Sequence, residues 1–239
     1  MNPPRAQPED YIDLLIATPG AASGVEAARV QPDEPRRPAH DAFARLLHRL
    51  EPDPSALWAE AKPQVDLADG IPVPDDSTLD EPYAASIGLV GRHWSGKHRA
   101  VVQGISLVTP LWTDGDRHVP SDYRLYHEAS DELTKDDHFR AMIRAAHGRG
   151  FRPRRVAFDG WYGSLENLEA PRGIGLAWLT RLKSNRLVDK VGQGSRPLLR
   201  TEIAAAGTEV RPRGYGLAEA FGIVAQTATS RTGRPATWR

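Results

Sequence analysis

The sequence contains no cysteine. Disulfide frameworks, thiolate catalysis and cysteine-based zinc or iron–sulfur sites are therefore excluded. The sequence also lacks an apolar signal core in its first residues and any apolar run near membrane-spanning length. With 239 residues and 40% hydrophobic content, the chain can build one large domain or two modest ones. We therefore expect a globular, cytoplasmic protein with no membrane partner.

The distribution of charge is asymmetric, although the formal net charge is zero. Residues 1–90 carry 7 Lys and Arg against 16 Asp and Glu, whereas residues 149–239 carry 16 against 7. A basic C-terminal third suits a polyanionic partner such as nucleic acid. Arg-rich composition is also common in proteins from GC-rich genomes, so charge alone leaves both interpretations open.

The chain begins with helical signals and continues with strands. The predicted helices of the first part cover residues 11–17, 40–50 and 56–61. Beyond residue 70, residues 100–112 form an apolar, β-branched run, as expected for a strand buried on both faces. A capping box at Thr134 begins a helix that Gly148 and Gly150 end. Further strands are predicted over residues 123–127, 155–158 and 176–182, with a helix over 165–170. This order indicates a mixed α/β sheet with helical crossovers, which several α/β folds share.

Acidic residues near two strand ends are candidate metal ligands. Asp75 and Asp76 lie near the start of the sheet region, and Asp159 follows a crossover strand, where open α/β sheets place ligands. Carboxylates at adjacent strand ends can hold Mg²⁺ ions, which activate a water or a DNA 3′-hydroxyl in phosphodiester transfer. The alternative is that these aspartates form turns or cap helices, as most Asp residues at strand ends do.

Two runs resemble a known enzyme family. Residues 158–168 (FDGWYGSLENL), followed by residues 178–186 (WLTRLKSNR), resemble the second-aspartate region of bacterial insertion-sequence transposases of the DDE superfamily. These are IS4-like enzymes with a ribonuclease H-like catalytic domain. The resemblance extends from about residue 10 to about residue 225 and includes DDSTL at residues 75–79.

The resemblance implies an α/β fold and a division of the chain. We expect a ribonuclease H-like mixed sheet with flanking helices, preceded by a small helical module that contacts DNA. The module would cover residues 1–68, the catalytic core residues 69–225, and an irregular tail residues 226–239. The implied reaction is DNA cleavage and strand transfer at the terminal repeats of an insertion sequence, with double-stranded DNA as partner. A homodimer and association with the bacterial nucleoid would follow.

The resemblance also assigns roles to individual residues and implies Mg²⁺ or Mn²⁺ as cofactor. The assigned metal ligands are Asp76, with Asp75 as the other choice, and Asp159; the neighbours of the site are Trp161 and Tyr162; the phosphate contacts are Arg181, Lys183 and Arg186. For the three basic residues, an ordinary solvated basic stretch is the alternative.

The third acidic ligand of this family, a Glu on a later helix, has no match. Glu128 precedes Asp159, which is the wrong order, so we interpret it as a turn or surface residue. The later candidates lack basic companions on a helix; they are Glu166, Glu169, Glu202, Glu209 and Glu219. Because residues 226–239 show no periodicity, we expect a reading frame truncated or shifted near residue 226, with weak metal binding and no cleavage as the chain stands.

Two further features bear on activity. Pro72 and Pro74 lie in the strand that leads to the first aspartate, which predicts a frayed strand or a damaged pocket. Residues 91–97 (GRHWSGK) have the spacing of a phosphate-binding loop, but His98 replaces the Ser or Thr and a strand follows, so a hairpin turn is expected.

Other functions can be weighed from the sequence. Neither a zinc site nor a serine hydrolase has a supporting motif. The rival interpretations are a non-catalytic DNA-binding remnant or inhibitor, a poorly folding pseudogene product, and an unrelated metal-dependent nuclease or phosphatase.

Overall fold

The computed structural model describes residues 3–19, 22–32, 35, 37–216 and 218–220. The chain divides into two compact units, Met1–Asp53 and Pro54–Arg239. The predicted tail over residues 226–239 lies outside the described residues.

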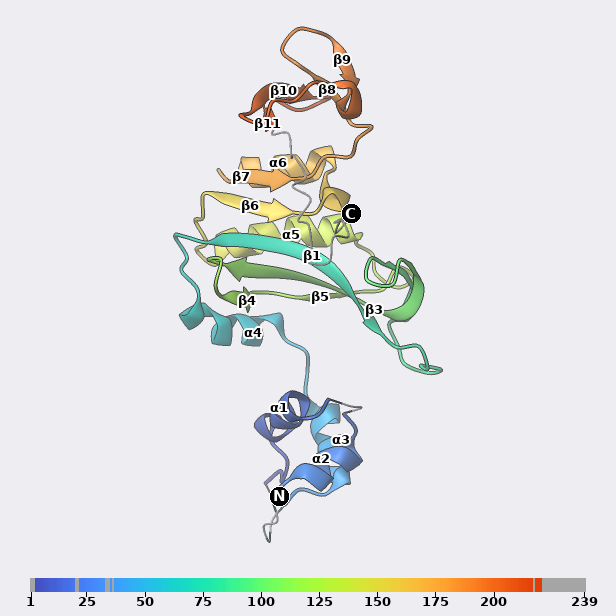
Figure 1. Cartoon of the computed structure of the whole chain (residues 1–239). Helices are drawn as coiled ribbons and strands as arrows, with labels where there is room; N and C mark the ends of the chain where they lie inside the picture. The colour runs from blue at the N-terminus through green and yellow to red at the C-terminus, as the bar shows by residue number, and fades with distance from the viewer. Residues whose placement is uncertain (1–2, 20–21, 33–34, 36, 217, 221–239) are drawn as a thin grey trace, which may run out of the picture. The chain divides into compact units, whose positions relative to one another are not determined.

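The first unit is helical, as the sequence predicts. Its described helices are α1 (Pro8–Ala17), α2 (Gly24–Val30) and α3 (His40–Arg49) (Figure 1). Leu14, Phe43 and Leu46 are fully buried and pack together, because their spacing places them on the inner faces of α1 and α3. The short helix α2 was not predicted from the sequence; it begins where the Ser23 hydroxyl accepts the Glu26 N–H.

The helix α4 (Pro54–Ala61) belongs to the second unit, although we expected it in a module ending at residue 68. The Trp58 ring lies 5.1 Å from the Phe151 ring, and the Arg149 guanidinium lies 5.4 Å from the Trp58 ring. These contacts span a long stretch of sequence, so helical spacing alone could not reveal them. A single helical turn, η1 (Lys62–Gln64), follows α4.

The second unit is built around a long central strand, β3 (Ala100–Thr113). On it pair, all antiparallel, β1 (Ile71–Asp80), β2 (Val90–Ser95), β4 (His118–Pro120) and β5 (Arg124–Tyr126). Only one face of β3 is fully buried: from Gly104 to Trp112 the even-numbered residues are buried and the odd-numbered ones are partly exposed. The expectation of a strand buried on both faces was therefore wrong, because an apolar run does not reveal how completely each face is covered.

The two prolines of β1 do not fray the strand, which pairs with β3 along its whole length. Pro74 faces Pro110, and since neither has an N–H, this is a non-hydrogen-bonded pair of the antiparallel ladder. Pro72 falls in the same phase, so both missing donors point away from β3. On that other side, no ladder joins β1 to β6 within the described residues. The strand therefore tolerates both prolines.

The crossover elements complete the sheet. They are α5 (Lys135–Gly148), β6 (Arg155–Phe158), a turn η2 (Gly160–Tyr162), α6 (Leu165–Gly173) and β7 (Ala177–Thr180). The strands β6 and β7 are parallel, and Figure 1 shows β6 beside β1 with β7 beyond it. Phe139 and Ile143 of α5 pack with Val156 of β6 and Leu168 of α6, which places both helices on one face. The strands lie in the order β3, β1, β6, β7, with the remaining strands on the far side of β3; this is a ribonuclease H-like mixed arrangement, although β6 and β7 lie beside β1 without a ladder to it among the residues described.

A second, smaller antiparallel sheet follows the core and was not predicted. Its order is β11 (Ala218–Ala220), β10 (Thr208–Pro212), β8 (Leu187–Asp189), β9 (Ser195–Pro197), with a turn η3 (Leu198–Arg200) between β9 and β10. These strands have three to five residues each, too short for a clear alternating pattern. No helix among the described residues is long and apolar enough to span a membrane.

Candidate active site

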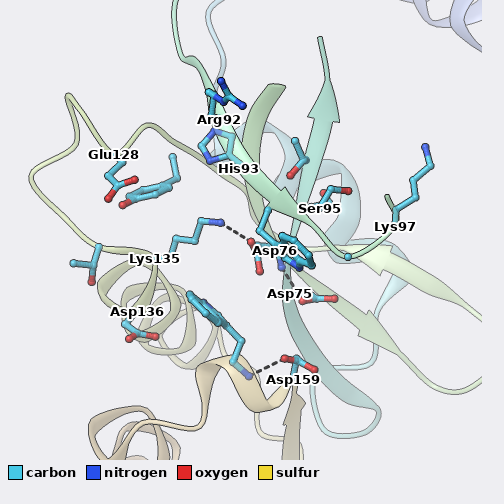
Figure 2. Close-up of a pocket in the computed structure, with 17 residues that line it drawn as sticks. Asp75, Asp76, Arg92, His93, Ser95, Lys97, Glu128, Lys135, Asp136 and Asp159 are labelled. Carbon is cyan, nitrogen blue, oxygen red and sulfur yellow. Dashed lines mark hydrogen bonds and ion pairs between the residues drawn. The ribbon is translucent and has the colours of Figure 1, made fainter. Parts of the chain in front are cut away.

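An open pocket of about 870 Å³ lies where β1, the β2–β3 hairpin, the start of α5 and the end of β6 meet. Asp75, Asp76 and Asp159 line it together with Trp161 (Figure 2). The fold thus brings two segments separated by more than eighty residues of chain to one cavity. All three aspartates singled out in the sequence face the same pocket.

Asp75 carries the clearest electrostatic signature of this gathering. Burial raises the pKa of its carboxyl above the ordinary value, and the nearby carboxylates of Asp76 and Asp159 raise it further. The Asp76 N–H donates to Asp75 Oδ1 at 2.9 Å, which opposes the shift. A carboxyl whose pKa is raised by burial and by two neighbouring negative charges marks a place where a cation would be stabilised.

Asp76 already has a cationic partner. The Lys135 Nζ lies 2.5 Å from Asp76 Oδ2, and both side chains are largely buried, with exposures of 20% and 27% (Figure 2). Lys135 is the first residue of α5, and its ammonium also lies 5.6 Å from the Tyr126 ring. No role in the site was predicted for Lys135. The capping box at Thr134 fixed where α5 begins, but nothing local showed which side chain the lysine would meet.

Asp159 combines the two roles that the sequence left as alternatives. Its Oδ1 accepts the Trp161 N–H at 2.7 Å and so caps the η2 turn. The same residue lines the pocket. A cap fixes the side-chain rotamer of the aspartate and does not remove it from the cavity, so the turn-forming role is compatible with ligand binding.

Tyr162 lies in the core behind the pocket. It is fully buried, and its ring stacks on Phe139 with centroids 5.0 Å apart. Burial raises the pKa of its phenol strongly, with the negative charges of Asp76 and Asp75 acting in the same direction. The phenol therefore stays neutral and supports the wall of the site.

Two more acidic residues, Asp136 and Glu128, line the pocket. Asp136 Oδ1 accepts the Asn167 Nδ2–H at 2.7 Å. Glu128 lies in an exposed turn, as expected, and also faces the cavity. Within the described residues, no group of three or more His, Cys, Asp or Glu is arranged to hold a metal ion.

The later glutamates do not join this site in the described part of the chain. Glu166 is an exposed helix residue, as expected, with its carboxylate 3.1 Å from the Arg140 guanidinium. Glu169, Glu202 and Glu209 are also exposed and line neither pocket. The surroundings of the Glu219 side chain lie outside the description.

Of the three basic residues predicted to contact phosphate, two line a pocket and one does not. Lys183 and Arg186 line a neighbouring pocket of about 350 Å³, which also has Trp161 and Asp136 in its wall. Arg181 lines neither pocket. Its backbone carbonyl instead packs against Gly160, where a Cβ would come within 2.2 Å of the oxygen, so this close contact requires glycine.

The β2–β3 hairpin forms the opposite wall of the carboxylate pocket. Residues 90–95 and 100–105 pair antiparallel, which confirms the predicted hairpin in place of a phosphate-binding loop. Arg92, Trp94 and Lys97 line the cavity from this side. Two bonds from the hairpin reach β1: His98 Nε2 lies 2.7 Å and Lys97 Nζ 3.5 Å from Asp80 Oδ2.

Comparison with known proteins gives one match over almost the full length. A family model described as DDE superfamily endonuclease matches residues 4–239. No curated protein matches the chain. Similar solved structures include a piggyBac transposase synaptic complex with hairpin DNA (11% identity, TM-score 0.43, 82% of this chain and 46% of that chain). The Drosophila P element transposase strand transfer complex is similar at 9% identity and TM-score 0.42, over 79% of this chain and 46% of that one. The chain spans about half the length of these structures. On the family match, this chain belongs to the DDE superfamily endonucleases.

Proposed function

We propose that this chain is a transposase of the insertion-sequence type, with Asp76 and Asp159 as ligands of Mg²⁺ or Mn²⁺ and Asp75 beside them. The observation that carries the proposal is that these aspartates, from β1 and from the end of β6, line one pocket. The family membership supports the same chemistry. Terminal-repeat DNA, a homodimer, an IS4-like origin and a place in the bacterial nucleoid are parts of this proposal.

The donor atoms present fit a hard divalent cation. Carboxylate oxygens are the ligands that Mg²⁺ prefers. The pKa of Asp75 is raised by burial and, to a smaller extent, by the charges of Asp76 and Asp159, which a cation would neutralise. When bound, such an ion supplies an activated water or 3′-hydroxyl and stabilises the leaving oxygen. Among the chain's own residues, the η2 turn holds the Asp159 carboxylate in place, and Lys135 forms an ion pair with the Asp76 carboxylate.

Metal binding is proposed to be weak. The family chemistry uses a third carboxylate, and no group of three suitable side chains is arranged for a metal within the described residues. Asp136 lines the same pocket, but one of its oxygens is engaged by Asn167. Each missing carboxylate removes both a ligand and a neutralising charge.

A Mn²⁺ titration of the full chain, followed by electron paramagnetic resonance, tests the metal site. We expect weak binding that disappears in Asp76→Asn and in Asp159→Asn. Glu169→Gln serves as the matched control, because Glu169 is exposed and lines neither pocket. Binding that survives both aspartate substitutions would contradict the assignment.

Cleavage is tested on supercoiled plasmid carrying the repeats that flank the gene. We expect no Mg²⁺-dependent nicking above background. Nicking that Asp159→Ala abolishes would show that a third ligand exists and that the enzyme is active.

A second candidate function is DNA binding without catalysis, as a remnant or an inhibitor of a complete enzyme. The arrangement of only part of a metal site among the described residues favours it. Binding to terminal-repeat DNA that falls steeply with salt, without cleavage, would support this function.

A further inference from the structure

Trp161 occupies an unusual position for a tryptophan. Its side chain is 63% exposed, and it stands in the wall of both the carboxylate pocket and the neighbouring pocket. The backbone N–H of Trp161 donates to Asp159 Oδ1, so the Trp161 backbone is bonded directly to the second aspartate. An exposed indole on a turn held this way is a surface for contact with a partner, because it contributes little to the core.

The Lys183 ammonium lies over one face of the indole, so a base would stack on the other face. The Lys183 ammonium lies 5.4 Å from the centre of the Trp161 ring, and no aromatic ring packs against Trp161 among the described residues. A cation beside the ring favours binding of a nucleic-acid strand. When a base stacks on the ring, the cation lies close to the phosphate of that nucleotide. Trp94 is similarly exposed, at 67%, but it lies on the hairpin and lines only the carboxylate pocket.

The pocket beyond Trp161 has the chemistry of a phosphate site. Lys183, Asn185, Arg186 and Ser164 supply donors to its wall. Its single acidic residue is Asp136, whose Oδ1 is occupied by the Asn167 amide. At about 350 Å³, it is less than half the size of the carboxylate pocket. Such a cavity accommodates one phosphate group in preference to a duplex.

We propose that Trp161 is a stacking platform for an unpaired nucleobase, and that the pocket of Lys183 and Arg186 holds the adjoining phosphate. The strand would pass from the carboxylate pocket, over the indole, into the basic pocket. This rests on the proposed function, which places a phosphodiester at the aspartates. The partner is a DNA strand with at least one unpaired base, because bases inside a duplex already stack on each other and present no free face.

The test measures binding of the full chain, in EDTA, to a short mixed-sequence single strand and to the same strand with abasic sites, by fluorescence anisotropy. We expect Trp161→Ala to weaken binding to the intact strand by roughly 10-fold and Trp161→Phe to retain most of the affinity. The abasic strand should bind Trp161→Ala and the unmodified protein equally. Lys183→Gln should weaken both strands alike and reduce the slope of affinity against salt, since it removes a phosphate contact.

Two results would overturn the platform. Equal affinity of Trp161→Ala and the unmodified protein for the intact strand would show that no base stacks on the indole. An equal loss on intact and abasic strands would show that the indole acts by positioning Lys183 or by supporting the turn. Since Asp76 and Asp159 are tested separately by Mn²⁺ binding, either result can occur while the metal site stands. Loss of the metal site would instead appear as Mn²⁺ binding that is indifferent to both aspartates.

Discussion

At the scale of single residues, the ion pair with Lys135 limits how readily the Asp76 carboxylate can bind another cation. Its ammonium sits 2.5 Å from Asp76 Oδ2, where a cation bound by that carboxylate would be. Burial leaves both side chains only partly hydrated, so the pair is stronger than an exposed surface pair but is still screened by solvent. A metal ion at the proposed site would therefore compete with a cation that the protein itself supplies.

We predict that Lys135→Met tightens Mn²⁺ binding, by up to about 5-fold, because it removes this competing charge. Lys135→Arg keeps the charge and is the matched control, with binding close to that of the unmodified protein. Electron paramagnetic resonance titration gives both values. Weaker binding in Lys135→Met would refute the competition and identify the lysine as the group that orients Asp76.

The start of α5 is, at the scale of elements, the feature that delivers Lys135 and Asp136 to the pocket. The Thr134 hydroxyl accepts the Asp137 N–H, and Asp137 Oδ2 in turn accepts the Thr134 N–H at 3.0 Å. The Thr134 hydroxyl also donates to Asp137 Oδ2 at 2.6 Å, and this bond, the bond from the Thr134 N–H and the bond from Arg140 lower the pKa of Asp137 to about 2. The capping box therefore stabilises the helix that brings Lys135 and Asp136 to the pocket.

Thr134→Ala is predicted to lower the free energy of unfolding by about 1 kcal/mol, whereas Thr134→Ser, which keeps the hydroxyl, should change it little.

Asp137 contributes a pH dependence to the stability of the protein. Because its pKa in the folded protein is depressed, its stabilisation is present above the ordinary value of 3.8 and is lost as pH falls toward 2. Urea unfolding between these pH values should show a shallower acid loss in Asp137→Asn. Parallel curves for the two proteins would contradict the cap.

The phase of the β1–β3 ladder makes a second prediction about an element. Val73 lies between Pro72 and Pro74 and so belongs to a hydrogen-bonded pair with Leu111. Val73→Pro should remove a ladder bond and destabilise the protein by about 1–3 kcal/mol. Pro74→Ala should cost less than Val73→Pro, because its nitrogen points away from β3 and only the packing of its buried ring is lost. Thermal or urea unfolding compares the two, and equal losses would show that the phase is wrong.

Charge is divided between the two units at the scale of the whole molecule. Residues 1–53 carry 6 Lys and Arg against 9 Asp and Glu, whereas residues 54–239 carry 25 against 22. Sequence-independent DNA binding depends on phosphate neutralisation, so the second unit is the better candidate for it. DNA contact by the helical unit, which the resemblance implies, would have to rely on specific contacts.

A fragment covering residues 54–239 is therefore predicted to keep most of the affinity of the full chain for non-specific duplex, with the same salt slope. A fragment covering residues 1–53 should show none at moderate salt. Anisotropy titrations at several salt concentrations measure both fragments, after circular dichroism has shown that each is folded. Salt-dependent binding by the first fragment alone would reverse the assignment.

The sequence by itself determined the local structure and the class of chemistry. Helical periodicity and the capping box located α3 and α5, and a short apolar run ending in Asp159 located β6 and the second aspartate. These features depend on neighbours within a few residues, so they can be seen in the chain. The runs around residues 158–168 and 178–186 pointed to the family that the full-length match then showed.

Only the tertiary structure decided what these residues meet. Lys135 and Asp76 are 59 positions apart, and Trp58 packs on Phe151 across an even longer stretch, so no local pattern could pair them. The same holds for the two prolines, whose effect depends on which side of β1 has a hydrogen-bonded partner. Trp161 became a wall between two pockets because β6, α5 and the residues after β7 converge there. Sequence fixes the local backbone and side-chain chemistry, whereas long-range packing sets the charge, burial and free surface of each group.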